Sequence, residues 1–257
     1  AFVVRVRYEK PFATAELNWL GRDISLEPSD AGEGYEAYAL LGIGMRDKLS
    51  GSSFPVRVLV DSGGQPHLLT CSVARTPKDF PEQRLNVDKQ YVDISEENLA
   101  RHRLEKKAIN KALGTVSEAA LWDCPMVRPV PGVVTSPFGL RRFFNDQPRN
   151  PHSGVDLDGE EGDHVLAAFS GRVLLAAEHF FAGKSVYIDH GQGVISVYIH
   201  LSSILVKGGQ EVDAGQVIGL VGETGRVTGP HLHLGLSILG QRIDPLTVGP
   251  AVEELCW

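Results

Sequence analysis

Short segments in which apolar and polar residues alternate recur through most of this 257-residue chain, and glycine-containing turns separate them. Residues 2–8 (FVVRVRY) and 54–60 (FPVRVLV) show the alternation clearly, and residues 68–74 repeat it after the turn sequence DSGG at 61–64. A period of two places successive side chains on opposite faces of a strand, which is typical of half-buried antiparallel strands. The chain is therefore predicted to be mainly β.

Residues 95–113 are the exception and predict a long helix. Ser95 can cap its first turn, and Gly114 stands where helices commonly end. Its apolar stripe is narrow, so we expect a connector helix on the surface, with its charges in solvent. The stripe consists of Leu104, Ala108 and Ala112. A second, short helix is expected near residues 117–122.

Three parts follow from these patterns. Residues 1–93 predict a small β domain of the sandwich or partial-barrel kind, and residues 94–125 a helical connector that ends in a proline-rich boundary. Residues 126–257 predict one antiparallel sheet with glycine turns. Its expected strands include residues 172–176, 185–189, 195–199, 217–221 and 232–238, with a hairpin turn at 190–193.

Composition excludes several classes of protein. With 42% hydrophobic and 22% charged residues, the chain reads as an ordinary globular protein, and no run of 18 apolar residues predicts a transmembrane segment. The net charge of −7 argues against a nucleic-acid partner, because a surface that follows phosphates needs an excess of Lys and Arg.

Histidine is distributed unevenly. Seven of the nine histidines follow residue 150, in the half that also holds 19 of the 28 glycines. Histidine serves both as a metal ligand and as an acid or base near neutral pH. The second half is therefore where a metal or acid/base site is expected.

Three short patterns can bring these histidines together. They are His152 with Asp156 four residues later, His200 in the sequence YIHL, and the pair His231 and His233 separated by one leucine. Residues at i and i+2 of a strand share a face, so the last pair points one way while the leucines point into the core, and Gly235 is expected to leave space beside the site. An imidazole, a carboxylate and a second imidazole match the protein ligands of a hydrolytic zinc site.

In order and spacing these patterns resemble the lysostaphin-type zinc metallopeptidases of the bacterial cell wall, the LytM-like peptidase family M23. The resemblance extends from about Pro129 to Leu246. The segments that carry it are 135–141 (TSPFGLR), 152–156 (HSGVD), 162–168 (GDHVLAA), 171–173 (GRV), 189–191 (DHG), 198–202 (YIHLS), 215–219 (GQVIG), 222–225 (GETG), 228–235 (TGPHLHLG) and 244–246 (DPL).

The resemblance implies the fold, cofactor and activity. It implies an antiparallel catalytic domain of the lysostaphin or duplicated-hybrid-motif type, with Zn²⁺ held by His152, Asp156 and His233. His200 and His231 then occupy the family's catalytic positions. The implied activity is a zinc metalloendopeptidase that hydrolyses peptide stems or bridges of peptidoglycan in the periplasm or cell envelope.

Two rival functions stay open. Some family members are non-catalytic regulators that activate cell-wall amidases, and a zinc hydrolase of this kind can also act on peptides outside the wall. The part before the catalytic domain can anchor the enzyme, pack against its groove or block it. The oligomeric state is not predicted.

The remaining candidates are given structural roles. His190 is expected to sit in a turn, and His164 and His179 are expected to be exposed. Four arginines of the second half are interpreted as solvated loop charges, with contact to an acidic peptide stem as the alternative: Arg141, Arg142, Arg149 and Arg226. The cysteines show no metal-ligand spacing, and a bridge between Cys124 and Cys256 is an alternative to free thiols.

Overall fold

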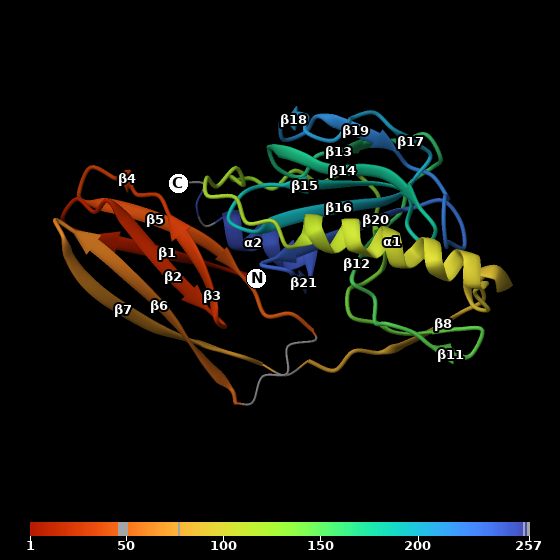
Figure 1. Ribbon diagram of the computed structural model, residues 1–257, viewed down its shortest axis with the longest axis horizontal. Coiled ribbons are helices and arrows are strands. Elements are labelled where there is room, and N and C mark those ends of the chain that lie inside the picture. The colour runs from red at the N-terminus through yellow and green to blue at the C-terminus, as the bar shows by residue number, and fades with distance from the viewer. Residues whose placement is uncertain (46–50, 77, 254, 256–257) are drawn as a thin grey trace.

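The computed structural model describes residues 1–45, 51–76, 78–253 and 255. The chain forms two β-rich parts side by side, with one long helix lying against the second part (Figure 1). No helix among the described residues is long and apolar enough to cross a membrane.

The first part is a sandwich of two antiparallel sheets, as predicted. One sheet has the order β1-β5-β4 and the other β3-β2-β6-β7. In β6 every second side chain is buried, because the strand presents one face to the facing sheet and the other to solvent. The strands are β1 (Phe2–Tyr8), β2 (Thr14–Trp19), β3 (Arg22–Leu26), β4 (Ser29–Asp30), β5 (Tyr35–Leu41), β6 (Ser53–Ser62) and β7 (Gln65–Ala74).

The second part is built on an antiparallel sheet of eight strands, in the order β18-β14-β15-β16-β20-β12-β9, with β21 paired to β20. A smaller sheet, β13-β19-β17, lies beside it. The predicted mainly β, antiparallel fold is confirmed. The strands are β9 (Val134–Ser136), β12 (Gly154–Leu157), β13 (His164–Leu166), β14 (Gly171–His179), β15 (Gly183–Asp189), β16 (Val194–Leu201), β17 (Ser203–Ile204), β18 (Glu211–Val212), β19 (Val217–Leu220), β20 (Leu232–Ile238) and β21 (Gln241–Ile243).

One strand from the first half of the sequence joins the second part. β8 (Glu82–Leu85) pairs with β10 (Arg141–Phe144), which continues into β11 (Gln147–Pro148). The β8–β10 pair is parallel, an exception to the antiparallel pattern. A domain boundary at residue 93 stays a prediction, because β8 lies before it and pairs beyond it.

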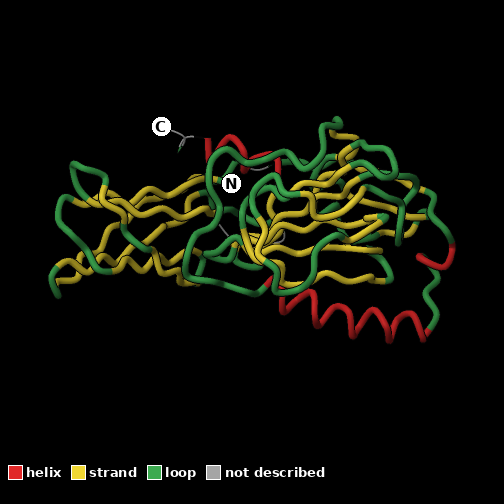
Figure 2. The backbone as a smooth tube through the Cα atoms, turned by 90° about the horizontal axis from the view of Figure 1, so that it is seen from above, coloured by secondary structure: helices red, strands yellow, loops and turns green. Residues whose placement is uncertain are grey.

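The long helix α1 (Glu96–Leu113) begins and ends where the sequence predicts. The Ser95 side chain accepts a hydrogen bond from the backbone N–H of Asn98. The predicted apolar stripe is wrong, however, because Leu104 is 67% exposed. The helix instead packs its Ile109 and Ala112 face onto the sheet, and Figure 2 shows it running along one side of that sheet.

No helix forms at residues 117–122, contrary to the prediction. This segment runs along the turn at 190–193 instead. The backbone N–H groups of Leu121 and Trp122 donate to the carbonyl of His190, and the N–H of Gln192 donates to Ser117. The turn thus satisfies backbone groups that a helix would have paired internally.

The two parts share one continuous hydrophobic cluster. Gly42 lies against Ile243 so closely that a Cβ atom there would meet the Ile243 side chain at 2.8 Å. The Gln192 side chain donates to the carbonyl of Tyr38 at 3.1 Å. The C-terminal elements η2 (Pro245–Thr247) and α2 (Val248–Glu253) complete the contact region, with α2 against β1.

Candidate metal centre

Three adjacent strands bring the predicted site residues together. β20 lies between β12 and β16 in the sheet, and His233 on β20 is the cross-strand partner of Asp156 on β12 and of Ile199 on β16. His152 lies just before β12. Antiparallel pairing thus brings to one place residues that are about 80 positions apart in the sequence.

Three ligand-type atoms converge at this point. His152 Nε2 lies 2.9 Å from Asp156 Oδ1 and 2.9 Å from His233 Nδ1, and His233 Nδ1 lies 2.7 Å from Asp156 Oδ1. All three residues are buried. His152 also donates its Nδ1–H to the carbonyl of Pro137 at 2.8 Å.

The donor chemistry fits a zinc ion. Because the Nδ1–H of His152 is directed to Pro137, the neutral ring presents a lone pair at Nε2, towards a carboxylate oxygen that also carries lone pairs. Tetrahedral zinc with bonds of about 2.0–2.1 Å separates its ligand atoms by about 3.3 Å. A cation would therefore require only a small opening of this triangle.

Charge in the cluster favours the ligand forms. Burial opposes ionisation of Asp156, but its close contacts with the side chains of His152 and His233 outweigh burial and hold the pKa of the carboxyl well below its usual range. Burial lowers the pKa of His233 to about 4. A carboxylate and neutral imidazoles are the forms that bind a metal ion.

A glycine clears the space for the His233 ring, but it is not the predicted one. A Cβ atom on Gly154 would lie 2.6 Å from His233 Nε2 and 2.3 Å from the carbonyl oxygen of Leu234. Gly235, which we expected to leave space, is packed between Val197 and Arg242. Gly154 and Gly235 are cross-strand partners on the same face of the sheet, so the alternation along a strand does not tell which of them borders the ring.

His200 is aimed at the site by a bulge in β16. The register between β15 and β16 shifts near Val186, and His200 takes a left-handed conformation with φ of 69°. Non-glycine residues rarely adopt this conformation, and it recurs at functional sites. The ring donates its Nδ1–H to the carbonyl of Thr224 at 2.8 Å, and burial lowers its pKa well below the ordinary value.

His231 stands beside His200, with their ring centroids 5.1 Å apart. It donates its Nδ1–H to the carbonyl of Gly229 at 2.8 Å, and its Nε2 lies 3.8 Å from Asp156 Oδ1. In both rings Nδ1 points to its backbone carbonyl, and the second nitrogen, Nε2, points away from that carbonyl. All five residues singled out in the sequence lie in one cluster.

Arg142 belongs to the site, contrary to its interpretation as a solvated charge. Its Nη2 donates to Asp156 Oδ2 at 2.7 Å and to Ser136 Oγ at 3.0 Å. Its Nε donates to Gln83 Oε1 at 2.9 Å, and Gln83 is the residue that faces Arg142 across the β8–β10 pair. Sequence reasoning missed both residues, because nothing in the sequence indicates that β8 pairs with β10.

Arg226 is also not a solvated charge. Its guanidinium carbon lies 4.6 Å from the ring centroid of Phe144 and 4.6 Å from that of Phe181. Burial, together with the positive charges of Arg142 and Arg149, lowers its pKa to about 10. The cation is thus stacked between two aromatic rings beside the site.

The other histidines have structural environments. His190 is buried and bonds the carbonyl of Ser170 and the hydroxyl of Ser196, both at 2.7 Å, which agrees with its predicted role in a turn. His164 is exposed, as predicted. His179 is 5% exposed, so its predicted exposure is wrong. Its ring bonds the Ser185 hydroxyl at 2.7 Å across the β14–β15 hairpin.

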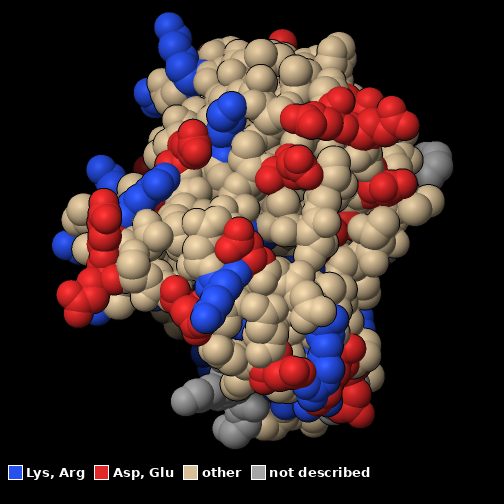
Figure 3. Space-filling model, turned by 90° about the vertical axis from the view of Figure 1, so that its right-hand side faces the viewer, with Lys and Arg blue, Asp and Glu red and all other residues tan. Residues whose placement is uncertain are grey.

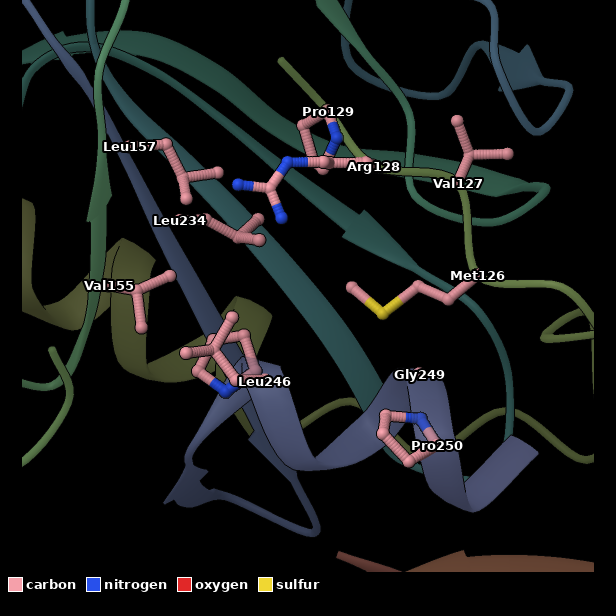
Figure 4. Close-up of a pocket in the computed structure, with 11 residues that line it drawn as sticks. Met126, Val127, Arg128, Pro129, Val155, Leu157, Leu234, Leu246, Gly249 and Pro250 are labelled. Carbon is pink, nitrogen blue, oxygen red and sulfur yellow. The ribbon is translucent and has the colours of Figure 1, made fainter. Parts of the chain in front are cut away.

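A cavity of about 180 Å³ lies on the other face of β12 and β20 (Figure 4). Val155, Leu157 and Leu234 line it, and these residues alternate along the strands with Asp156 and His233. Because the alternation puts them on opposite faces, this cavity is behind the metal ligands and is separate from them. On the end of the molecule drawn in Figure 3, acidic side chains gather at the upper right, and basic and acidic side chains are interspersed on the left and at the bottom.

The fold and the site define a class of protein: a β-sheet metallopeptidase with a His–Asp–His donor set. Residues 150–245 match the model of peptidase family M23. The crystal structure of a Pseudomonas aeruginosa protein assigned to peptidase M23 superimposes with a TM-score of 0.72, at 30% sequence identity over 97% of this chain and 93% of that one. The chain belongs to peptidase family M23.

Curated relatives agree with this family. The peptidoglycan DD-endopeptidase ShyA of Vibrio cholerae is 43% identical over 114 residues, which are 44% of this chain and 26% of that protein. The DD-carboxypeptidase/endopeptidase Mpg of Neisseria meningitidis is 38% identical over 122 residues, 48% of this chain and 28% of that protein. The matches thus span about a quarter of each relative. The family and the donor set together confirm the predicted Zn²⁺ cofactor.

Proposed function

We propose that this protein is a zinc metalloendopeptidase that hydrolyses peptide cross-links of peptidoglycan. The observation that carries the proposal is the convergence of the His–Asp–His donor set with two further imidazoles, His200 and His231, at one buried point. The DD-endopeptidase names of relatives favour the D,D-peptide bonds of cross-links over peptide bridges.

In this proposal His152, Asp156 and His233 hold the zinc ion. The chemistry that zinc supplies when bound is Lewis acidity, which polarises the scissile carbonyl group and makes a water molecule nucleophilic near neutral pH. Arg142 fixes the second oxygen of Asp156, so that Oδ1 stays directed at the two imidazoles.

His200 and His231 handle the protons. Each gives its Nδ1–H to a backbone carbonyl, so each neutral ring presents a lone pair at Nε2. The ring that accepts the proton of the attacking water becomes an N–H donor. It can then stabilise the negative charge on the carbonyl oxygen or give the proton to the leaving amine. Two such imidazoles replace the glutamate that serves as base in other zinc peptidases.

The site of action follows from the substrate. Peptidoglycan lies outside the cytoplasmic membrane, so the proposed location is the periplasm or cell envelope. The first part of the chain, with β8 against β10, is proposed to pack beside the substrate groove.

A test of this function uses the purified chain with one equivalent of zinc and isolated sacculi. Mass spectrometry of the products should show cross-linked muropeptide dimers converted to monomers by hydrolysis of a D,D-peptide bond. If zinc-loaded protein released no product from sacculi with direct cross-links or with peptide bridges, the proposal would be wrong. A regulator of amidases would instead leave the peptides intact and increase amidase activity in a mixed assay.

A further inference from the structure

Among the residues that the structure describes, Arg226 has no acidic partner. The ionisable groups that interact with its charge are Arg142, Arg149, the Tyr91 hydroxyl and His102, and none of these is a carboxylate. Its neighbours at the guanidinium are the faces of Phe144 and Phe181. Aromatic faces attract a cation but leave its N–H donors without acceptors.

Arg226 lies between two elements of the proposed active site. Phe144 is two residues from Arg142 on β10, so both side chains are on the same face of that strand, about 7 Å apart. Arg142 contacts Asp156. On the other side, Thr224 is two residues before Arg226, and its carbonyl orients His200. An extended peptide bound at the metal centre would therefore reach the guanidinium within a few residues.

An anion would offset the cost of this arrangement. A partly buried cation beside two other arginines is unfavourable unless a negative charge compensates for it. A carboxylate accepts two parallel hydrogen bonds from a guanidinium, which is the geometry that arginine recognises best. Peptidoglycan stem peptides carry free carboxylates at their C-terminus and on their acidic residues.

We propose that Arg226 binds a free carboxylate of the stem peptide, in a subsite next to the metal centre. This inference rests on the proposed function and adds the chemical group that selects the substrate. The two aromatic rings hold the plane of the guanidinium, and the positive charges of Arg142 and Arg149 add to the potential at Arg226. Amidated stem peptides are then poor substrates.

The experiment compares synthetic cross-linked peptides in which each carboxyl group is amidated in turn. For the wild-type protein, one amidation should lower kcat/KM by about 10- to 100-fold, the effect of a lost charge-assisted hydrogen bond. In Arg226→Met, which keeps an unbranched side chain between the two rings, that amidation should have no effect. Arg226→Lys should retain part of the preference.

Arg172→Gln is the matched control, because Arg172 is exposed on β14, and β15 and β16 separate that strand from β20 in the sheet. It should keep the wild-type preference, and melting temperatures should show that each variant is folded. The proposal is overturned if no amidation affects the wild type, or if Arg226→Met keeps the full preference. The second result would mean that Arg226 only joins the two aromatic rings.

Failure of the proposed function can be told apart from failure of this subsite. If the zinc-loaded wild type hydrolyses none of the peptides, calorimetric binding of the same peptides still tests the subsite. Weaker binding of one amidated peptide to the wild type, with no such difference in Arg226→Met, would support it. Equal binding of all peptides to both proteins would overturn it.

Discussion

Arg142 Nη2 lies 2.7 Å from Asp156 Oδ2, while the other oxygen of the same carboxylate faces His152 and His233. The carboxylate is therefore shared between an arginine and the proposed metal position. Removal of a group that orients a metal ligand in this way commonly lowers metal affinity or activity by about 10- to 100-fold.

Arg142→Gln is expected to weaken zinc binding by about 10- to 100-fold, because Asp156 loses the donor that fixes its orientation. Competition with a chromophoric chelator measures the affinity directly, without an activity assay. Arg128→Gln, which changes an arginine lining the cavity on the opposite face of the sheet, should leave the affinity unchanged. Equal affinities for wild type and Arg142→Gln would contradict the assigned role.

Gln83→Leu is also expected to weaken zinc binding, but by less than Arg142→Gln does, because Gln83 acts through Arg142. Gln83→Glu keeps an oxygen acceptor for Arg142 and should retain most of the affinity. Arg84→Ala is the control on the same strand, since Arg84 contacts Phe143 and Asp146 and not the carboxylate. If Gln83→Leu and Arg84→Ala lowered the affinity equally, the effect would come from the strand and not from Gln83.

His200→Ala is expected to lower kcat by about 10²- to 10⁴-fold and to leave zinc bound, because the ring is placed for proton transfer and not among the three ligands. Metal analysis after gel filtration, together with muropeptide release, checks both parts. His233→Ala should lose zinc as well as activity. A His200→Ala protein that loses its metal would show that the ligand set is misassigned.

Chelation is expected to lower the melting temperature. A ligand present at 1,000 times its Kd stabilises the folded state by about 4 kcal/mol, which corresponds to about 10 °C for a chain of this size. Differential scanning calorimetry with and without zinc measures the shift. Asp156→Ala should melt at the same temperature in both conditions.

Acid should destabilise the fold through His190. Burial lowers the pKa of His190 to about 4, below the value of about 6.5 in an unfolded chain. The unfolded state therefore binds a proton that the folded state does not, and stability falls as the pH decreases from about 6.5 to about 4. Between pH 7 and pH 5 the loss is about 2 kcal/mol.

His190→Gln should remove that part of the pH dependence. Urea unfolding at pH 7 and pH 5 gives the two free energies, and the difference between them should be smaller in the variant by about 2 kcal/mol. His164→Gln, which replaces an exposed imidazole, should keep the wild-type difference. An unchanged difference in His190→Gln would exclude His190 as the group responsible.

The sequence indicates the strands and the site to different degrees. The alternation at 54–60 and the DSGG turn predict β6 and β7 correctly, because both signals are local. The candidate site residues are recognisable because metal ligands and acid/base groups are limited to a few residue types. They include His152, Asp156 and the two histidines on either side of Leu232. The helix that the sequence predicts at residues 117–122 does not form, because the backbone partners of this segment come from the distant turn at 190–193.

Features that depend on long-range pairing could not be predicted. The bulge that turns His200 into the site depends on the register between β15 and β16. Gly154 borders the His233 ring only because β12 pairs with β20, and local sequence does not indicate that pairing. Gln83 and Arg142 meet only because β8 pairs with β10, 59 residues apart in the sequence.

That pairing also limits how the enzyme can be divided or grafted. A fragment cut at residue 126, or a chimera that inherits only residues 150–245, would contain all the proposed ligands and both imidazoles proposed to be catalytic. The fragment would leave the edge of β10 unpaired, and the chimera would lack that strand altogether. The smallest transferable unit therefore begins before β8, inside what the sequence pattern assigns to the first domain.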